Sequence, residues 1–384
     1  MSEEVIDIIQ LSRAFGVGPV IYKKLIAKFG SARDALNEVR KNPFIAGREI
    51  KLISRQDAEK EYRDGQNIQA ICITQENAFY PTPLLETDNA PIFFWLKGDV
   101  HILQKTSCAI VGSRNASVGG RKIAYSLAQN ITKKGFVTIS GLARGIDAAA
   151  HKGSLESGTI AVLASGVDHI YPPEHKDLYH DILAHGGAII SENPPGAQPK
   201  ANLFPKRNRI ISGLAKAVVI VEGGLRSGSL STAYYALNQN RELFAVPGSP
   251  LDPRAAGPNK LLKSGASWAE SSEDVLNYLE DINANGHKAL SQQIKEKVCD
   301  NIKPDLTDEE DMAAYTIAEN AKKAYQDEQD FLSYFGTVPI SEDEIIRLSG
   351  RAPADILCEL SEHEILGNIE RLAGNMFLKI PMKI

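Results

Sequence analysis

Three cationic side chains, Lys206, Arg207 and Arg209, lie close together in the segment FPKRNRIISGLA at residues 204–215. The apolar run that follows them is typical of a helix, so the sequence predicts a cationic loop that leads into a helix. Such a junction suits a phosphate, because the side chains supply charge and free backbone N–H groups at the helix start point at the anion. Phe204 adds an aromatic face for a nucleic-acid base. The alternative interpretation is a solvated turn with ordinary surface arginines.

Three other segments combine glycines with charged or hydroxyl side chains: GSRNASVGG at 112–120, SGLARGIDAAAH at 140–151 and EGGLRSGSLSTA at 222–233. Glycine lets a backbone approach a phosphate closely, and serine offers a hydroxyl beside its N–H group. None of them is a G-x-G-x-x-G fingerprint with an acid at ribose distance, so we expect no dinucleotide cofactor and no other cofactor. Across all these segments, the candidate DNA-binding residues are Gly112, Ser113, Arg114, Gly141, Arg144, Lys200, Phe204, Lys206, Arg207, Asn208, Arg209, Ser227, Gly228 and Ser229.

Catalytic and metal-binding alternatives rest on weaker patterns. Asp147 and His151 are four residues apart on a predicted helix and could form an acid–base pair. We favour a capping role for Asp147 and a structural role for His151. The serines at the strand ends lie in no G-x-S-x-G elbow. Four histidines could be read as a metal cluster: His169, His175, His180 and His185. Their spacing puts them on different helical faces, so we expect no metal site. We also expect no catalytic residue.

Short apolar runs, most of them separated by helix-length stretches, predict how these loops are positioned. The runs lie at 108–112, 136–140, 159–164, 187–191, 217–221 and 243–247, and an earlier strand pair is expected at 68–74 and 91–99. This pattern is the signature of an extended Rossmann-like, doubly wound, mostly parallel α/β sheet. Ligands bind beyond the carboxyl ends of such strands, where all the candidate loops would meet. Several anion-ready loops on one edge suit a polymer with several phosphates.

The ends of the chain predict smaller domains. Residues 1–65 indicate a helical domain with a tight turn at 15–19, similar to a helix-hairpin-helix, and 66–282 form the α/β core. Residues 283–335, with an acidic cluster at 305–311, predict a linker. Residues 336–384 predict two helices closed by Gly350 and Gly367 and a hairpin joined at Gly374, the outline of a winged-helix-like module. Its second helix is acidic, so we expect a protein-contact or packing role there.

Charge and composition narrow the function class. The chain has 384 residues and a formal net charge of −5, yet seven basic and no acidic residues lie between 101 and 146, and five basic and no acidic residues lie between 196 and 221. Two basic stretches in an acidic protein predict one basic face. No apolar run suits a membrane span, and the acidic start is unlike a signal peptide. The four scattered cysteines, without a C-x-x-C pair, favour a reducing cytoplasm; they are Cys72, Cys108, Cys299 and Cys358.

The motifs taken together resemble the DNA-processing protein A family, also called Smf. The matching segments occur in family order over about residues 105–275: VGSRNAS, SGLARGID, TIAVLASGVDHIYPPEH, SENPPG, FPKRNRIISGLA, SGSLSTA, AVPGSPLDP and GPNKLLKSGA. The resemblance implies a Rossmann-like core without a nucleotide cofactor, an N-terminal domain like a sterile-alpha-motif fold, and a C-terminal winged-helix-like domain. The EGG at 222–224 departs from the more usual EA-type sequence of the family.

The resemblance also implies partners and residue roles. It implies binding of single-stranded DNA, loading of the RecA recombinase onto it in natural transformation, contact with single-strand-binding protein, and a homodimer formed through the core. Arg114 would hold a backbone phosphate, while the loops at 141–144 and 227–229 would add N–H and hydroxyl contacts. Phe204 would stack a base, with the basic residues of its segment shaping the pocket. Lys200 resembles the family's basic residue ahead of the Phe-Pro pair.

Three functions are consistent with these patterns and with what the resemblance implies. The first is a non-enzymatic, cytoplasmic binder of single-stranded DNA that loads RecA. The second is a Rossmann-like nucleotide phosphoribohydrolase, which would place Glu192 or Glu222 at a ribose. The third is a scaffold protein that uses its acidic C-terminal domain.

Overall fold

The computed structural model describes residues 2–45, 48–285, 331–332, 335, 339–349, 351, 353–365, 368–372 and 375–379. The predicted acidic cluster at 305–311 and the predicted closing glycines at 350, 367 and 374 lie outside the described residues. No helix in the described ranges combines the length and the apolar character that crossing a bilayer requires. The boundaries at 65, 282 and 335 stay predictions.

The N-terminal domain is helical, as predicted. Its elements are α1 (Ser2–Ser12), α2 (Pro19–Phe29), α3 (Ala32–Lys41), β1 (Phe44–Ile45) and β2 (Arg48–Glu49). Helix α2 begins with a proline, whose fixed φ suits a first turn, and ends at Gly30 with a φ of 86°. The N–H group of Gly30 donates to the carbonyl oxygen of Ile26 at 2.8 Å, which closes the helix.

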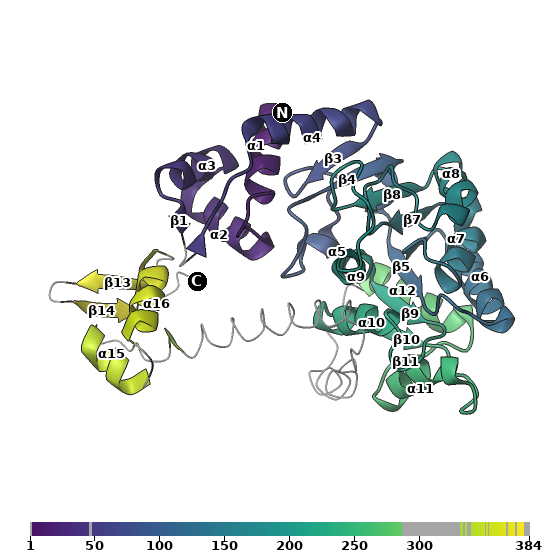
Figure 1. Ribbon diagram of the computed structural model, residues 1–384. Helices are drawn as coiled ribbons and strands as arrows, with labels where there is room; N and C mark the ends of the chain where they lie inside the picture. The colour runs from purple at the N-terminus through teal and green to yellow at the C-terminus, as the bar shows by residue number, and fades with distance from the viewer. Residues whose placement is uncertain are drawn as a thin grey trace. The chain divides into compact units, whose positions relative to one another are not determined.

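The core is one sheet of nine strands in the order β11-β10-β9-β5-β6-β7-β8-β4-β3, all between residues 48 and 285 (Figure 1). The strands from β11 to β8 are parallel to their neighbours, whereas β4 and β3 are antiparallel. This confirms the mostly parallel α/β sheet. The bounds are β3 (Ile71–Thr74), β4 (Phe93–Gly98), β5 (Ser107–Val111), β6 (Val137–Ser140), β7 (Thr159–Val162), β8 (Ala188–Ser191), β9 (Ala217–Ile220), β10 (Glu242–Ala245) and β11 (Ser267–Trp268).

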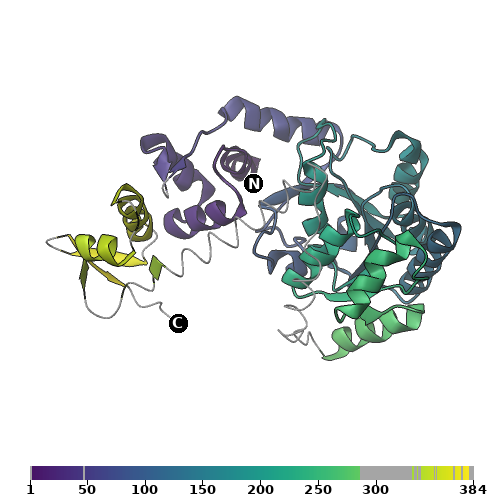
Figure 2. The same ribbon diagram turned by 60° about the horizontal axis from the view of Figure 1, so that its bottom comes forward.

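Helices cover both faces of this sheet, as Figures 1 and 2 show. One face packs against α5 (Thr82–Leu85), α9 (Leu203–Leu214), α10 (Ser229–Asn238) and α11 (Ala256–Lys263). The other packs against α6 (Val118–Lys133), α7 (Ile146–Ser154) and α12 (Ser272–Asn285), and α8 (Lys176–Ala184) lies beside α7. Helix α4 (Arg55–Asn67) precedes the sheet, and short 3-10 turns lie at η1 (Val100–Gln104), η2 (Leu155–Ser157), η3 (Pro173–His175) and η4 (Pro253–Ala255).

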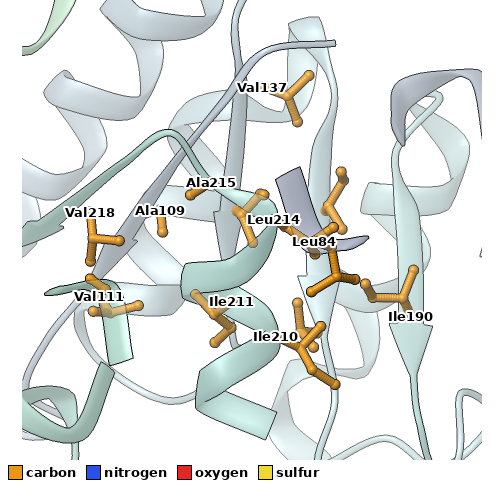
Figure 3. Close-up of a cluster of buried hydrophobic side chains, with 14 of the residues drawn as sticks. Leu84, Ala109, Val111, Val137, Ile190, Ile210, Ile211, Leu214, Ala215 and Val218 are labelled. Atoms are coloured by element: carbon orange, nitrogen blue, oxygen red, sulfur yellow. The ribbon is translucent and has the colours of Figure 1, made fainter. Parts of the chain in front are cut away.

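Both faces are buried because alternate residues of each central strand point to opposite sides. In β5, Ala109 and Val111 belong to one buried cluster, whereas Cys108 and Ile110 belong to the other. Figure 3 shows the first cluster, in which side chains of α9, including Ile210, Ile211 and Leu214, lie over the strands. Continuous apolar runs in the sequence therefore mark strands that are covered on both sides.

The C-terminal domain has the predicted order of two helices and a hairpin. Its elements are β12 (Ile340–Ser341), α15 (Glu342–Ser349), α16 (Pro353–Ile365), β13 (Ile369–Leu372) and β14 (Met376–Lys379). The strands form an antiparallel sheet in the order β12-β14-β13. The short strand β12 was not predicted. A small buried cluster that includes Ile345, Ile356 and Phe377 holds these elements together.

Candidate nucleic-acid interface at the carboxyl edge of the sheet

The loops after β5 and β6 are packed directly against each other. The N–H group of Ile146 donates to the carbonyl oxygen of Ser113 at 3.2 Å. Gly145 has a φ of 76°, and a Cβ atom there would lie 2.2 Å from the same oxygen. A Cβ on Gly112 would lie 2.7 Å from the carbonyl oxygen of Glu222. These two glycines therefore serve close backbone packing between loops, which fixes the loop that carries Arg114.

Helix α9 begins earlier than predicted. Its first residue is Leu203, so Phe204 and the three cationic residues lie in its first two turns and not in a preceding loop. Pro205 is compatible with this start because proline is tolerated in the first turn. Arg207 shares a helical face with Ile210, Ile211 and Leu214, and that face is buried. This spacing is the sequence signal that Arg207 points inward.

Arg207 is a buried guanidinium beneath the loop that follows β6. Only 6% of the residue is exposed, and its Nη1 donates to the carbonyl oxygen of Val162 at 3.1 Å. A Cβ on Gly141 would lie 1.4 Å from Nη1, so this glycine makes room for the guanidinium. Its Nε is buried without a hydrogen-bond partner among the described residues. Burial lowers the pKa of Arg207 to about 10, although the nearby Asp147 acts in the opposite direction.

Asp147 supports the same loop from below. One of its carboxylate oxygens accepts from the N–H groups of Gly141 at 3.0 Å and Ala143 at 3.4 Å. Burial raises the pKa of Asp147, whereas Arg207 and the backbone donors lower it. The helix-capping role favoured from the sequence is therefore wrong, because α7 begins after Gly145 without a side-chain cap and Asp147 bonds to the preceding loop instead.

His151 is fully buried and uses both ring nitrogens. Thr159 donates its hydroxyl proton to the carbonyl oxygen of Thr138 at 2.7 Å, so it accepts at 2.9 Å from Nδ1 of His151. The other nitrogen, Nε2, accepts from the N–H group of Leu142 at 3.3 Å. Burial lowers the pKa of His151 to about 3, and the charges of His175 and Arg207 add to this effect. A neutral imidazole with both nitrogens engaged is a structural group and a poor general base.

Leu142 is held between two histidines. It is fully buried with a φ of 54°, an uncommon conformation for leucine. Its N–H group donates to His151, and its carbonyl oxygen accepts from Nδ1 of His175 at 2.9 Å. These two bonds stabilise a strained residue in the middle of the loop after β6, where such strain often accompanies a binding site.

An aromatic ring with cationic neighbours lies above these loops. The guanidinium carbon of Arg114 lies 5.0 Å from the ring centroid of Phe204, and that of Arg207 lies 6.0 Å away. Tyr171 contacts Phe204 edge-on at 5.9 Å between centroids and is 43% exposed. The two basic stretches of the sequence therefore meet at Phe204. We did not single out Tyr171, and its signal was the Tyr-Pro-Pro at 171–173, in the segment that follows the third apolar run.

The remaining predicted cations differ in their exposure and in whether they pair with an acid. Lys200 and Lys206 are exposed. Arg144 is exposed but pairs with Glu174, and this bond raises the pKa of the guanidinium. Arg209 is only 12% exposed in its side chain and binds both carboxylate oxygens of Glu192, at 2.6 and 2.5 Å.

The loop before α10 supplies hydroxyl groups. The hydroxyls of Ser227 and Ser229 lie 2.8 Å apart, and Gly228 precedes the first turn of α10. A Cβ on Gly228 would meet no atom within 4 Å, so the space over this turn is open. Asn208 donates to the hydroxyl of Ser231 at 2.9 Å and thereby ties α9 to the start of α10.

The two glutamates of the enzymatic alternative are engaged inside the protein. Glu192 binds Arg209, and Glu222 accepts from the N–H and hydroxyl groups of Ser117 at 2.8 and 2.5 Å. Within the described ranges, no group of three or more His, Cys, Asp or Glu side chains is placed to hold a metal ion. The N–H groups of Gly141, Leu142 and Ala143 donate to Asp147 and His151, so the N–H contacts expected from this loop are used inside the protein. The edge offers hydroxyls, guanidinium groups and two aromatic rings, which can hold phosphates and stack bases.

Three family models match parts of this chain. The family model described as DNA recombination-mediator protein A matches residues 71–280. A DprA-like N-terminal HHH domain matches 2–63, and a DprA winged helix domain matches 318–375.

Two relatives and two solved structures give the extent of the similarity. The chain is 44% identical to DNA processing protein DprA of Bacillus subtilis over 58% of this chain and 74% of that protein. It is 30% identical to protein Smf of Synechocystis over 94% of this chain and 96% of that protein. DprA from Streptococcus pneumoniae superposes with a TM-score of 0.60 and 29% identity, over 72% of this chain and 97% of that one. DNA processing protein A from Helicobacter pylori, described for its single-stranded DNA binding mode, gives a TM-score of 0.50 and 27% identity over 57% and 98%.

The family models thus cover the α/β core, the helical N-terminal domain and the winged-helix domain. The similarity to protein Smf extends over nearly the whole of both chains. The chain belongs to the DNA recombination-mediator protein A family.

Proposed function

We propose that this protein binds single-stranded DNA without strong sequence preference and loads the RecA recombinase onto it, in natural transformation and recombination. The observation that carries the DNA-binding part is the cluster around Phe204. An aromatic ring lies beside the exposed guanidinium of Arg114, at the edge where the loop before α10 adds the hydroxyl groups of Ser227 and Ser229. Stacking is independent of base identity, and phosphate contacts are independent of sequence.

The relatives support the same function. The Helicobacter pylori protein is described for single-stranded DNA binding, and the family description names a recombination mediator. We infer a non-catalytic role in the cytoplasm, as a homodimer formed through the core, with RecA and single-strand-binding protein as partners. Against the phosphoribohydrolase alternative, Glu192 and Glu222 are bound by Arg209 and Ser117, whereas that chemistry needs a carboxylate free to reach a ribose.

Fluorescence anisotropy of a labelled poly-dT oligonucleotide tests the proposal. Wild type, Arg114→Ala and the control Lys133→Ala are titrated over a salt series, with an equal length of duplex as competitor. Lys133 is an exposed cation in the last turn of α6, at the opposite edge of the sheet from Arg114. We expect preference for single strands, and a smaller salt slope in Arg114→Ala only, by about 0.7 for one lost phosphate contact.

An equal reduction of the salt slope in Arg114→Ala and Lys133→Ala would show that binding depends on net charge and not on the loop edge. RecA loading is tested separately by filament formation on DNA coated with single-strand-binding protein. The expected result is faster RecA assembly with wild type than with Arg114→Ala. If wild-type protein does not speed RecA assembly relative to a reaction without it, the loading part is refuted. The DNA-binding part is unaffected by that result.

A further inference from the structure

Glu222 lies at the point where the strand order of the sheet reverses. The chain runs from β5 through β6, β7 and β8 on one side, and β9 then returns to the other side of β5. The crevice between two such strands is where α/β proteins of this kind usually bind a ligand, with its phosphate on the N-terminus of the following helix. That helix is α6, and Glu222 comes just after β9.

The carboxylate of Glu222 occupies the N-terminus of α6. One oxygen accepts from the N–H group of Ser117 at 2.8 Å, and the other accepts from its hydroxyl at 2.5 Å. The same hydroxyl accepts from the N–H group of Gly120 at 2.8 Å, so the capping residue has no donor left. The carboxylate also neutralises the positive end of the helix.

The first turn of α6 is shaped around this carboxylate. A Cβ atom on Gly120 would lie 2.4 Å from the carboxyl carbon of Glu222, and 2.5 and 2.6 Å from its two oxygens. A larger residue at 120 would therefore expel the side chain. The anion and the helix start fit each other without space for a phosphate between them.

Glu222 also fixes the loop that carries Arg114. Its carbonyl oxygen accepts from the N–H group of Ser113 at 2.7 Å, while its side chain holds Ser117 at the other end of the loop. Arg114 lies between these two anchors, with its guanidinium beside the ring of Phe204. A single residue therefore holds both ends of the loop.

We propose that Glu222 is a specificity-determining and positioning residue, an internal anion that fills the phosphate site at the strand reversal. It excludes free phosphate and mononucleotides from the crevice, and it holds Arg114 outward, where a polymer backbone passes. The exclusion stands by itself, whereas the positioning of Arg114 rests on the proposed DNA-binding function. The crevice is thus closed to single nucleotides although the fold resembles that of nucleotide-binding proteins.

Removing the carboxylate of Glu222 tests whether it excludes phosphate from the crevice. We compare Glu222→Ala with the control Glu242→Ala, because Glu242 also accepts from a serine hydroxyl, that of Ser267 at 2.6 Å, but lies where β10 begins. With about 50 mM inorganic phosphate at constant ionic strength, Glu222→Ala should gain about 3 °C in Tm, the shift for a ligand at roughly ten times its Kd. Wild type and Glu242→Ala should shift less than Glu222→Ala and by equal amounts, since both keep the carboxylate of Glu222 and the exposed cations of the edge. Equal responses in all three proteins would overturn the exclusion.

Chemical rescue tests the positioning. Glu222→Ala should bind poly-dT about tenfold more weakly, and formate should restore part of this affinity by replacing the carboxylate. Formate should weaken wild type and Glu242→Ala only as any salt does. Undiminished affinity in Glu222→Ala, or a loss that formate leaves unchanged, would overturn the positioning role.

A volume-conserving variant covers the case in which Glu222→Ala does not fold. Glu222→Gln keeps an acceptor for Ser117 and fills the crevice, so it should lose less DNA affinity and gain no response to phosphate. A phosphate response as large as that expected for Glu222→Ala would contradict the exclusion. If wild type fails to bind poly-dT at all, the proposed function falls, and the phosphate experiment still decides whether Glu222 closes the crevice.

Discussion

Acidification should destabilise the core through one histidine. His151 is fully buried, and its pKa falls from 6.5 to about 3 in the folded protein. The unfolded chain therefore binds a proton below pH 6.5 that the folded chain does not take up until about pH 3. Stability is fully present above pH 6.5 and is lost as the pH falls through this window.

The size of the effect follows from the two pKa values. Between pH 7.5 and pH 5, protonation of the unfolded state costs the folded state about 2 kcal/mol, since each pH unit below 6.5 adds about 1.4 kcal/mol. His151→Gln should lack this contribution, because its amide can donate toward Thr159 and accept from Leu142 without titrating. Contributions that wild type and His151→Gln share cancel in the comparison.

Tryptophan fluorescence during urea unfolding provides the measurement. The chain has two tryptophans, Trp95 and Trp268, and both belong to the core sheet, so the signal reports on the core. Trp95 is fully buried and should give a large change on unfolding. From pH 7.5 to pH 5, the free energy of unfolding should fall by about 2 kcal/mol more in wild type than in His151→Gln. Losses that agree within about 0.5 kcal/mol would refute the assignment of a neutral, locked imidazole.

Three further predictions concern the same edge of the sheet. Phe204→Ala should weaken poly-dT binding by about 1–3 kcal/mol with an unchanged salt slope, because stacking and not charge is lost; a reduced slope would contradict this. Gly141→Ala should cost at least about 2 kcal/mol in urea unfolding, since its Cβ would collide with buried Arg207, whereas Gly119→Ala, with 3.6 Å to its nearest neighbour, should be close to neutral. Arg209→Met should be destabilising and Glu192→Met added to it partly restorative, with a coupling of about 1–3 kcal/mol in a double-mutant cycle; simple additivity would show that the pair is not coupled.

The sheet could be predicted because its strands are buried on both faces. Runs such as 108–112 and 217–221 have no polar residue, and each of them became a central strand. The two-residue strand β11 could not be predicted, since Ser267 and Trp268 carry no periodicity and pair only at the sheet edge. The rule that ligands meet at carboxyl ends then located the candidate site without any structure.

The roles of individual cations were harder to predict. Arg207 and Arg209 are two residues apart, yet one is buried beneath Gly141 and the other binds Glu192. Sequence alone does not show that a distant glycine leaves space for a guanidinium, or which acid will meet which base. These are properties of tertiary contacts between segments that are far apart in the chain, and local patterns carry no information on them.

The burial of Arg207 beneath a loop from another strand also bears on when the protein acquires its activity during synthesis. Its guanidinium bonds to β7 and lies under the loop after β6, while its own helix follows β8. The ribosome must therefore release most of the core before this side chain can take its place. Nascent chains that end before α9 lack both Phe204 and Arg207, so the proposed affinity for nucleic acid would arise late. Binding can therefore serve as a reporter that separates completed chains from truncated ones.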